Sequence, residues 1–397
     1  MLAAFTFNTT ENLPIGLLDV ISADLEVSLP AVGYLVTAYG LTVALVSLPI
    51  AHATRSMPRR HVLTVLLAAL VLSSLVSALG AGYWLLLAAR LVTALAQALF
   101  WAVMGPVAVG LFPPEVKGRV IGVLSVAGSL ALVLGVPVGT WLGRQSTWQV
   151  PLAVLAGLGL VSLVTIAALL PTSRPGEGHA AHGSAPDRRR FGIVLVTTAL
   201  SVTGAFTGYT YIVTFLDDVS GFSDTSAGAL LMVSGIAGVL GVTAAGPLLD
   251  RFPRGTLVVP VATQAAGLLG LYVVGTGQAA AIACLALLGG SLGPVFMATQ
   301  NQMLRVAPGR TEIALAANSG AYNAGIAAGA LLGGMILSAS DVRATFLVGG
   351  LLTLAALAAL LTEGLGRAVS DSHGQIRGGP DKVVAARLPV RKQRDAR

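Results

Sequence analysis

Long apolar runs dominate the chain, and short polar segments separate them. A helix needs about 20 mainly apolar residues to cross a bilayer. The runs lack the alternation over about 10 residues that marks the strands of a membrane β-barrel. The pattern therefore predicts an all-α membrane protein with twelve transmembrane helices. The twelve apolar windows are 1–22, 31–53, 61–81, 83–110, 118–143, 148–170, 191–216, 225–249, 255–275, 278–304, 312–338 and 342–363.

The longest internal polar segment divides these helices into two sets of six. Residues 171–190 are rich in glycine and proline and end in three arginines. We therefore expect an N-terminal six-helix bundle over 1–170, a cytoplasmic linker over 171–190 and a C-terminal six-helix bundle over 191–363. Residues 364–397 form a basic polar tail, which we expect to be disordered.

The composition agrees with a membrane protein. Hydrophobic residues make up 55% of the 397 residues and charged residues 10%, whereas a soluble domain carries about a quarter of charged residues. So little charge cannot cover the surface of a soluble enzyme or keep a chain disordered. Cys284 stands alone, which excludes an internal disulfide and a cysteine-based metal cluster.

The placement of the basic residues predicts the orientation in the membrane. With the N-terminus inside, 21 of the 24 Lys and Arg residues fall in inner loops and the tail. Arg144 and Arg343 then lie outside, and Arg90 lies within a helix. The net charge of +7 follows from this topology, so we do not expect nucleic-acid binding. We predict a multi-pass protein of the cell membrane with both termini cytoplasmic.

Glycines repeat at matching places in the two halves. Spacings of four and seven place them on one helix face, where two backbones can approach closely. Predicted helices 118–143 and 312–338 hold the same place in their halves. Such duplication is typical of a transporter whose two bundles rock about a central site. The glycines are Gly128, Gly135, Gly139 and Gly143, and Gly325, Gly329, Gly333 and Gly334.

Several segments are similar to motifs of known transporters. The chain resembles the major facilitator superfamily, and within it the drug:proton antiporter family 1. The branch is that of the sugar efflux transporters and the related arabinose and chloramphenicol exporters. The resemblance covers about residues 5–363. It implies two pseudo-symmetric six-helix bundles in a monomer that exports its substrate by alternating access. The segments are 7–11, 14–18, 33–39, 96–101, 133–139, 209–212 and 322–331.

Three charged residues within the spans are candidates for proton coupling. A charge at mid-membrane costs roughly 2.5–3.5 kcal/mol, so such a residue is a functional candidate by default. Burial favours the neutral form of Glu11 and a nearby Arg90 favours the carboxylate. A rocking motion that changes their separation would therefore exchange a proton. The alternative is a static pair of Arg90 with Glu11 or with Asp19. Asp19, nearer the outer end, is the third candidate, although it could equally lie at the water boundary.

Polar and aromatic side chains occur on the predicted helices 1–22, 83–110, 191–216 and 278–304. In the family that the chain resembles, these helices line the central cavity. Amides bond sugar hydroxyls and aromatic rings stack on sugar C–H faces, so the set suits a neutral, polar substrate. Polar contacts between helices are the alternative role for any one residue. The predicted substrate-binding residues are Asn8, Tyr39, Gln97, Trp101, Thr207, Tyr211, Gln300, Asn301 and Asn323.

The resemblance also implies residues that govern the conformational change. In the first half, Pro49 and Thr54 stand where the family's inner-loop motif has Gly and Asp, so the second half alone keeps the motif. Gln97 stands where this branch often has His. Since Gln does not titrate near neutral pH, this argues against a proton relay there. The predicted conformational residues are Arg55, Arg59, Gly135, Pro137, Gly139, Gly246, Asp250 and Arg251.

The sequence offers no catalytic constellation and no nucleotide-binding motif of the GxxxxGK[ST] type. We therefore predict a secondary exporter rather than an enzyme, with no metal and no cofactor. It would exchange protons for small neutral polar solutes such as sugars, within the lipid bilayer. The alternatives are a chloramphenicol-type antibiotic or multidrug exporter and, from another class, a membrane channel or sensor without active transport.

Overall fold

The computed structural model describes residues 1–54, 57–80, 82–111, 127–128, 130–171, 187–249, 251–306 and 311–377. This part of the chain contains helices and no strand, which confirms the predicted all-α class. The N-terminal half holds α1 (Leu2–Gly16), α2 (Leu18–Asp24), α3 (Leu29–Ala53), α4 (Arg59–Leu79), α5 (Tyr83–Gly110), the π-helical turn η2 (Ala131–Gly135), α7 (Val136–Gln145) and α8 (Gln149–Leu169).

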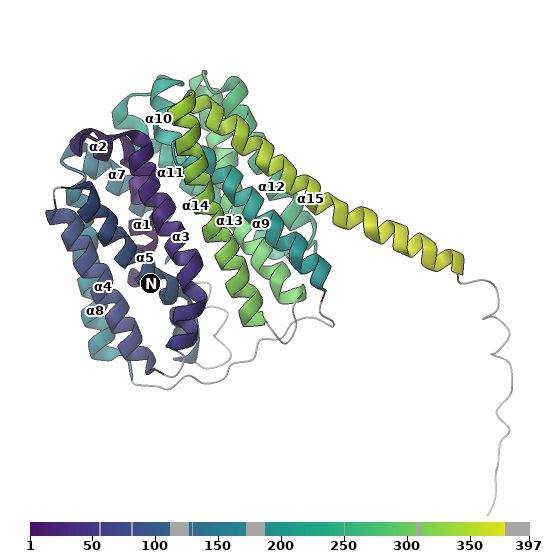
Figure 1. Cartoon of the computed structure of the whole chain (residues 1–397), viewed down its shortest axis with the longest axis horizontal. Helices are drawn as coiled ribbons and strands as arrows, with labels where there is room; N and C mark the ends of the chain where they lie inside the picture. The colour runs from purple at the N-terminus through teal and green to yellow at the C-terminus, as the bar shows by residue number, and fades with distance from the viewer. Residues whose placement is uncertain are drawn as a thin grey trace, which may run out of the picture.

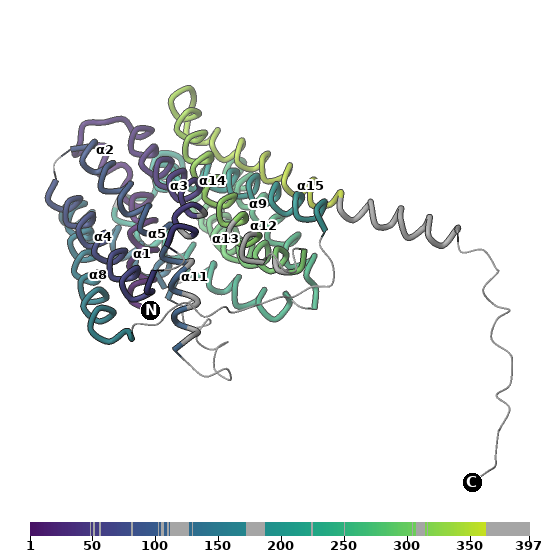
Figure 2. The backbone as a smooth tube through the Cα atoms, turned by 60° about the horizontal axis from the view of Figure 1, so that its bottom comes forward, coloured from purple at the N-terminus to yellow at the C-terminus, as the bar shows by residue number. Residues whose placement is uncertain are grey.

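The C-terminal half forms a second bundle beside the first (Figures 1 and 2). The two bundles meet along α3 and α14, which lie side by side in both views. The C-terminal half holds α9 (Arg188–Tyr209), α10 (Ile212–Asp218), η3 (Asp224–Ser226), α11 (Ala227–Ala245), η4 (Gly246–Leu248), α12 (Gly255–Val274), α13 (Gln278–Val306), α14 (Thr311–Ala339) and α15 (Val342–Arg377).

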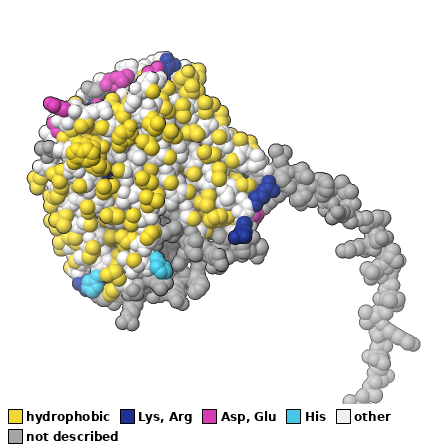
Figure 3. All heavy atoms as spheres, viewed as in Figure 1, with side chains coloured by type: hydrophobic (Ala, Val, Ile, Leu, Met, Phe, Trp, Pro, Cys, Tyr) yellow, Lys and Arg dark blue, Asp and Glu magenta, His cyan; other side chains and the backbone are white. Residues whose placement is uncertain are grey.

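Ten helices of the described residues are long and apolar enough to cross a membrane. They correspond to ten of the twelve predicted spans. The first predicted span is broken into two short helices, and most of the first half of the fifth lies outside the described residues. Apolar side chains cover most of the face seen in Figure 3, and acidic side chains gather at one end of that face.

The first helix of each half is broken at an equivalent place, where the sequence predicts one continuous helix. α1 ends at Gly16, two residues after Pro14, and Leu17 leaves the helical conformation before α2 begins. In the second half α9 ends at Tyr209, and α10 begins at Ile212. Pro14 removes the backbone hydrogen bond to Thr10, in the turn before the proline, so it explains neither the break at Leu17 nor the break after Tyr209.

The glycine faces pack on these broken helices, as their spacing suggests. A Cβ at Gly135 would collide with Thr9, and one at Gly139 would lie 2.7 Å from Leu13. In the second half, a Cβ at Gly333 would collide with the backbone oxygen of Thr207. Each glycine helix therefore holds the first helix of its own half in close backbone contact. This equivalence supports the predicted internal symmetry.

The interface between the two halves along α3 and α14, called the seam below, is tight at the acidic end and looser toward the opposite end. Gly33 leaves room for the Tyr211 hydroxyl, and a Cβ at Gly40 would lie 2.9 Å from the backbone oxygen of Asn323. Farther along the same helix pair, a Cβ at Gly320 would have its nearest neighbour, the oxygen of Ala44, at 3.9 Å. Along α3 and α14 the structure is therefore closed at the end predicted to face outward.

The last helix is longer than the sequence predicts. The apolar pattern places its end at residue 363, followed by a disordered tail, whereas α15 continues to Arg377. No proline interrupts the chain between residues 363 and 377, so the helix can continue into polar sequence. The rest of the tail, like residues 172–186 of the linker, lies outside the described residues.

Candidate functional site

The centre of the N-terminal half is built around a carbonyl group that lacks its usual helical partner. Pro14 has no N–H, so the carbonyl of Thr10, four residues earlier, receives no helical hydrogen bond from it. Arg90 of α5 supplies the missing donor: its Nη1 lies 2.6 Å from the Thr10 oxygen, and its Nη2 lies 3.0 Å from the Glu11 oxygen. Arg90 is 3% exposed, so its charge is held inside the bundle by the backbone of α1.

A chain of two hydrogen bonds leads from Tyr39, whose ring the guanidinium contacts, to a carboxylate. Tyr39 of α3 donates its hydroxyl to Gln97 Oε1 at 2.6 Å, and Gln97 Nε2 donates to Glu11 Oε2 at 2.5 Å. The Arg90 Cζ lies 4.6 Å from the centre of the Tyr39 ring, within the range of a cation–π contact. The four side chains form one connected network in the N-terminal half.

The structure brings Glu11 and Arg90 together, but not as an ion pair between side chains. Arg90 bonds the backbone oxygen of Glu11, whereas the carboxylate accepts a hydrogen bond from Gln97. Asp19 lies away from this network and pairs with Arg144 at 2.7 Å, with its side chain 33% exposed. The alternative of a static Asp19–Arg90 pair is therefore wrong, because the break after Gly16 places Asp19 on α2, against α7.

On the opposite side of the seam, the C-terminal half presents aromatic rings. Tyr322 of α14 and Phe296 of α13 contact each other edge to face, with ring centres 4.9 Å apart. A Cβ at Gly40, the residue after Tyr39, would lie 2.9 Å from the backbone oxygen of Asn323, the residue after Tyr322, so Tyr322 lies across the seam at the level of Tyr39. Neither Phe296 nor Tyr322 is among the predicted substrate-binding residues, although Tyr322 belongs to one of the recognised motifs.

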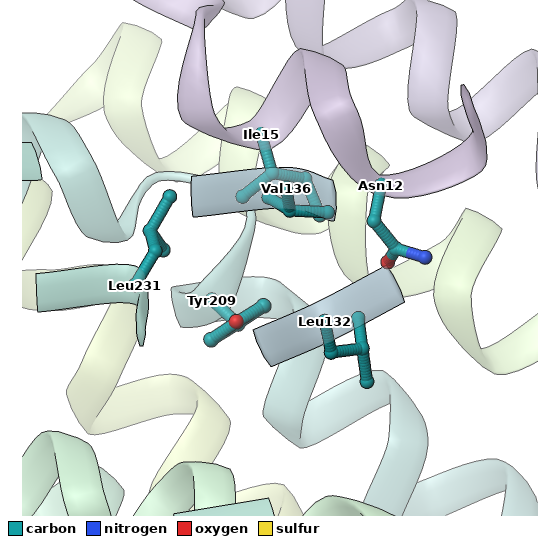
Figure 4. Close-up of a pocket in the computed structure, with 6 residues that line it drawn as sticks. All are labelled: Asn12, Ile15, Leu132, Val136, Tyr209 and Leu231. Atoms are coloured by element: carbon teal, nitrogen blue, oxygen red, sulfur yellow. The ribbon is translucent and has the colours of Figure 1, made fainter. Parts of the chain in front are cut away.

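A small pocket next to Glu11 lies between the halves (Figure 4). Asn12 and Ile15 enter it from α1, and Tyr209 from α9. The Tyr209 hydroxyl lies 3.4 Å from Ser234 Oγ of α11. Leu132, Val136 and Leu231 complete the wall. The pocket combines one amide and one phenol with apolar side chains, and its free volume of about 10 Å³ has room for about one water molecule in this state.

Several predicted residues surround the seam. The Asn8 amide donates to the Gly128 oxygen at 3.3 Å, and Trp101 approaches the same glycine and is 41% exposed. Gln300 donates to Ser319 Oγ at 3.4 Å, while its buried Oε1 has no hydrogen-bond partner among the described residues. Asn323 donates to the Ser319 backbone oxygen at 2.9 Å.

Asn301 points in a different direction from its neighbour Gln300. Its amide lies 3.5 Å from the backbone oxygen of Leu249, just past η4. This contact joins α13 to the loop that follows η4. A role in holding that loop therefore fits Asn301 better than the predicted substrate contact.

Thr207 and Tyr211, which the sequence predicts to bind substrate, pack against α14 and do not line the pocket. Thr207 is fully buried and donates to the Thr203 oxygen. Tyr211 is 1% exposed and donates to the Ala330 oxygen at 3.2 Å. Its ring and hydroxyl fill the space left by Gly33 of α3 and by Gly333 and Gly334 of α14. The break of the helix at this point turns Tyr211 into the seam, so Tyr209 lines the pocket instead.

The predicted conformational residues divide into two groups. In and after the π-helical turn, Gly135 and Gly139 contact α1, and the backbone oxygen of Pro137 would lie 2.9 Å from a Cβ at Gly228 of α11. These residues thus join α1, α7 and α11.

At the opposite end, Arg59 donates to the Thr54 oxygen at 3.4 Å, and Arg251 is exposed beside the Phe252 ring. Gly246 has open space around it. Arg55 and Asp250 lie outside the described residues, so their predicted roles stay predictions.

Comparisons with known proteins point to transport. The model of the family described as Major Facilitator Superfamily matches residues 1–312. A probable sugar efflux transporter of Helicobacter pylori strain P12 is 32% identical over 360 residues, which cover 90% of this chain and 92% of the relative. Another, from Mannheimia succiniciproducens, is 32% identical over 338 residues, with coverages of 84% and 85%.

Solved structures show the same fold. A mutant of the nucleoside transporter NupG matches with a TM-score of 0.74 at 12% identity, covering 91% of this chain and 97% of that one. A mutant of the peptide transporter POT matches with a TM-score of 0.70 at 11% identity, covering 91% of each chain. At these identities the likeness concerns the arrangement of helices alone.

Proposed function

Because the chain belongs to the Major Facilitator Superfamily of membrane transporters, we propose that it exports small neutral sugars in exchange for protons. The relatives named as probable sugar efflux transporters support the substrate class. The proton gradient is the energy source of the proposed cycle, with no cofactor. The proposed transporter acts as a monomer in the cell membrane, with both termini in the cytoplasm.

The observation that carries this proposal is the state of Glu11. Its carboxylate is half-buried at the seam and accepts a hydrogen bond from a neutral amide, Gln97. The neighbouring cation, Arg90, donates from Nη1 and Nη2 to two backbone oxygens. A carboxylate in a two-armed ion pair resists protonation, whereas Glu11 can take up a proton without breaking such a pair.

Uncharged polar and aromatic groups around Glu11 suit a neutral substrate. Asn12 and Tyr209 line the adjoining pocket, and Tyr322 and Phe296 contact each other on α14 and α13 of the second half. Arg90 is buried behind α1 and already bonded. An anionic substrate would therefore find no free cation among these groups, and a hydroxyl-rich one would find several partners.

The experiment is transport by the purified protein in sealed vesicles. With an imposed pH gradient, the native protein should move labelled arabinose or a labelled thiogalactoside uphill. Glu11→Gln should abolish uphill movement yet keep exchange of labelled for unlabelled sugar, because exchange needs no net proton transfer. Asp19→Asn is the matched control, since that carboxylate is paired with Arg144 outside the site. Uphill transport by Glu11→Gln would refute the coupling role.

An antibiotic exporter of the chloramphenicol type is the second candidate. Trp101 and Phe296 are 41% and 38% exposed, so aromatic surface is available for an apolar ring. Chloramphenicol therefore belongs in the same vesicle assay. Uphill movement of chloramphenicol without movement of either sugar would favour this candidate and reject the sugar substrate. Gradient-independent, unsaturable flux of any solute would instead indicate a channel.

A further inference from the structure

Two unpartnered polar atoms face the seam from opposite halves. Glu11 Oε2 is bonded to Gln97, whereas no hydrogen bond reaches Glu11 Oε1 from the described residues. The Tyr322 hydroxyl likewise has no hydrogen-bond partner among the described residues. Both side chains are half-buried, and neither atom is among the fully buried orphans. Each atom is therefore available to a molecule that enters the seam.

The geometry of the seam brings these two groups together. α3 and α14 approach at Gly40 and Asn323, where a Cβ would lie 2.9 Å from the opposing backbone oxygen. Tyr39 and Tyr322 are the residues just before these two in sequence. Tyr39 is joined to Glu11 through Gln97, so the network that holds the carboxylate and the Tyr322 ring lie at the same level of the seam.

An exposed aromatic surface lies beside the Tyr322 hydroxyl. Phe296 contacts the Tyr322 ring at 4.9 Å and is 38% exposed. One turn further along α13, the buried Oε1 of Gln300 has no hydrogen-bond partner in the part of the chain that the structure describes. A sugar offers both kinds of surface at once, because its ring has apolar C–H faces and a rim of hydroxyls. A buried polar atom without a partner is costly, which favours a ligand that supplies hydroxyl donors.

We propose that Tyr322 is a specificity-determining residue, whose hydroxyl favours a sugar over an aromatic drug, and that Phe296 beside it supplies the apolar face of the same subsite. The Tyr322 hydroxyl and Glu11 Oε1 bond hydroxyl groups on the sugar rim, and the Phe296 ring stacks on a C–H face. The inference rests on the proposed function, since it names how the same site recognises its substrate. It adds a wall from the second half to a site whose charged residues all come from the first.

The test is equilibrium binding of labelled thiogalactoside, arabinose and chloramphenicol to the purified full chain. Tyr322→Phe removes one hydroxyl and keeps the ring, so sugar binding should weaken roughly five- to tenfold, as expected for one lost hydrogen bond. Chloramphenicol binding should change less than twofold. Tyr272→Phe is the matched control, because that tyrosine lies on α12 beside Arg343 and outside the site.

Phe296 is tested by a pair of substitutions. Phe296→Leu removes the flat aromatic face and should weaken sugar binding. Phe296→Tyr keeps an aromatic ring and should bind sugar about as well as the native chain does. Circular dichroism and thermal unfolding identify any variant that fails to fold. Phe296→Tyr and Tyr322→Phe each add or remove a single oxygen atom. The comparison of their binding with that of the native chain therefore does not require the fold to tolerate a large change.

The outcomes separate this inference from the proposed function. Equal effects of Tyr322→Phe on sugars and chloramphenicol, or no effect on either, would overturn the inference. The same holds if the native chain binds no sugar. Native protein that binds sugar with the predicted discrimination, yet cannot move it uphill in a pH gradient, would overturn proton-coupled export and leave the recognition site standing.

Discussion

A double substitution can test whether Arg90 replaces the hydrogen bond that Pro14 removes from α1. In the native chain the Thr10 oxygen has Arg90 Nη1 at 2.6 Å instead of a helical N–H. Pro14→Ala introduces an N–H four residues after Thr10, which can close the usual helical bond. The guanidinium and the new N–H would then compete for one oxygen, so the effects of the two substitutions must depend on each other.

The magnitudes follow from the groups that lose partners. Arg90→Lys keeps the charge but loses the planar fork that reaches two carbonyls, so the Thr10 oxygen is left unpaired. An unpaired buried acceptor costs about 1–3 kcal/mol, and the weakened contact with the Tyr39 ring adds about 1 kcal/mol. Pro14→Ala alone should be close to neutral, because the regained helical bond offsets the displaced Arg90. In the Arg90→Lys background, Pro14→Ala should restore about 1–3 kcal/mol.

Reversible unfolding in mixed detergent micelles, followed by circular dichroism, measures the four free energies of this cycle. The control is Pro260→Ala with Arg90→Lys, since Pro260 lies within α12 of the other half. The control pair should be additive within about 0.5 kcal/mol, as distant sites are. Additivity of the same quality for Pro14→Ala with Arg90→Lys would refute the view that Arg90 satisfies the freed carbonyl.

Three further predictions concern packing and the closed end of the seam. Gly333→Ala should lower the unfolding free energy by about 1–3 kcal/mol, because the added Cβ would collide with the Thr207 backbone oxygen. Gly157 has open space around it, so Gly157→Ala should be neutral or stabilising by up to about 1 kcal/mol. Micelle unfolding measures both, and equal effects would contradict the packing argument. In a Cys284→Ser background, Ala330→Cys should react with a membrane-impermeant thiol reagent only after Tyr211→Ala opens the seam; labelling with Tyr211 intact would show that this residue forms no seal. Asp19→Asn should cost about 1–3 kcal/mol in micelle unfolding, since Asp19 is 33% exposed whereas Arg144, at 8% exposed, loses its charged partner, and a loss below about 0.5 kcal/mol would contradict this pairing.

The helices and their division into halves follow from the sequence because membrane spans need little more than length and apolarity. The glycine faces are also readable, since spacing alone places Gly135 and Gly139 on one side. The helix breaks at Leu17 and after Tyr209 cannot be predicted from apolarity or residue spacing. Apolar residues continue through both, and hydropathy averages over a window longer than either short helix.

The sites were harder to predict than the fold, for reasons that differ between residues. Glu11, Gln97 and Tyr39 stand out in the sequence because a polar group in a span is costly, and the structure joins them in one network, while their roles in transport stay predictions. Tyr211 was misplaced because helical spacing assumes an unbroken helix. Phe296 gives no signal of its own, since an aromatic residue in an apolar span looks like any packing residue. The partner of Arg90 could have been found from Pro14, which frees the carbonyl four residues earlier.

The arrangement changes how proton coupling must operate in the proposed cycle. The sequence suggests that rocking alters the separation of Glu11 and Arg90, yet both belong to the first half and Arg90 bonds the backbone of Glu11 itself. Gln97 and Tyr39 belong to that half too, and the glycine face of the fifth span holds α1 within it. A rigid rocking motion keeps all these contacts. What it changes is the distance from Glu11 to the second half, where Tyr322 stands, and the access of water along the seam. The affinity of Glu11 for its proton must therefore depend on what occupies the seam. In one state of the cycle this is solvent, and in the other it is substrate and Tyr322. Coupling then requires no movement of Arg90, whose role is to hold the bent helix that carries the carboxylate.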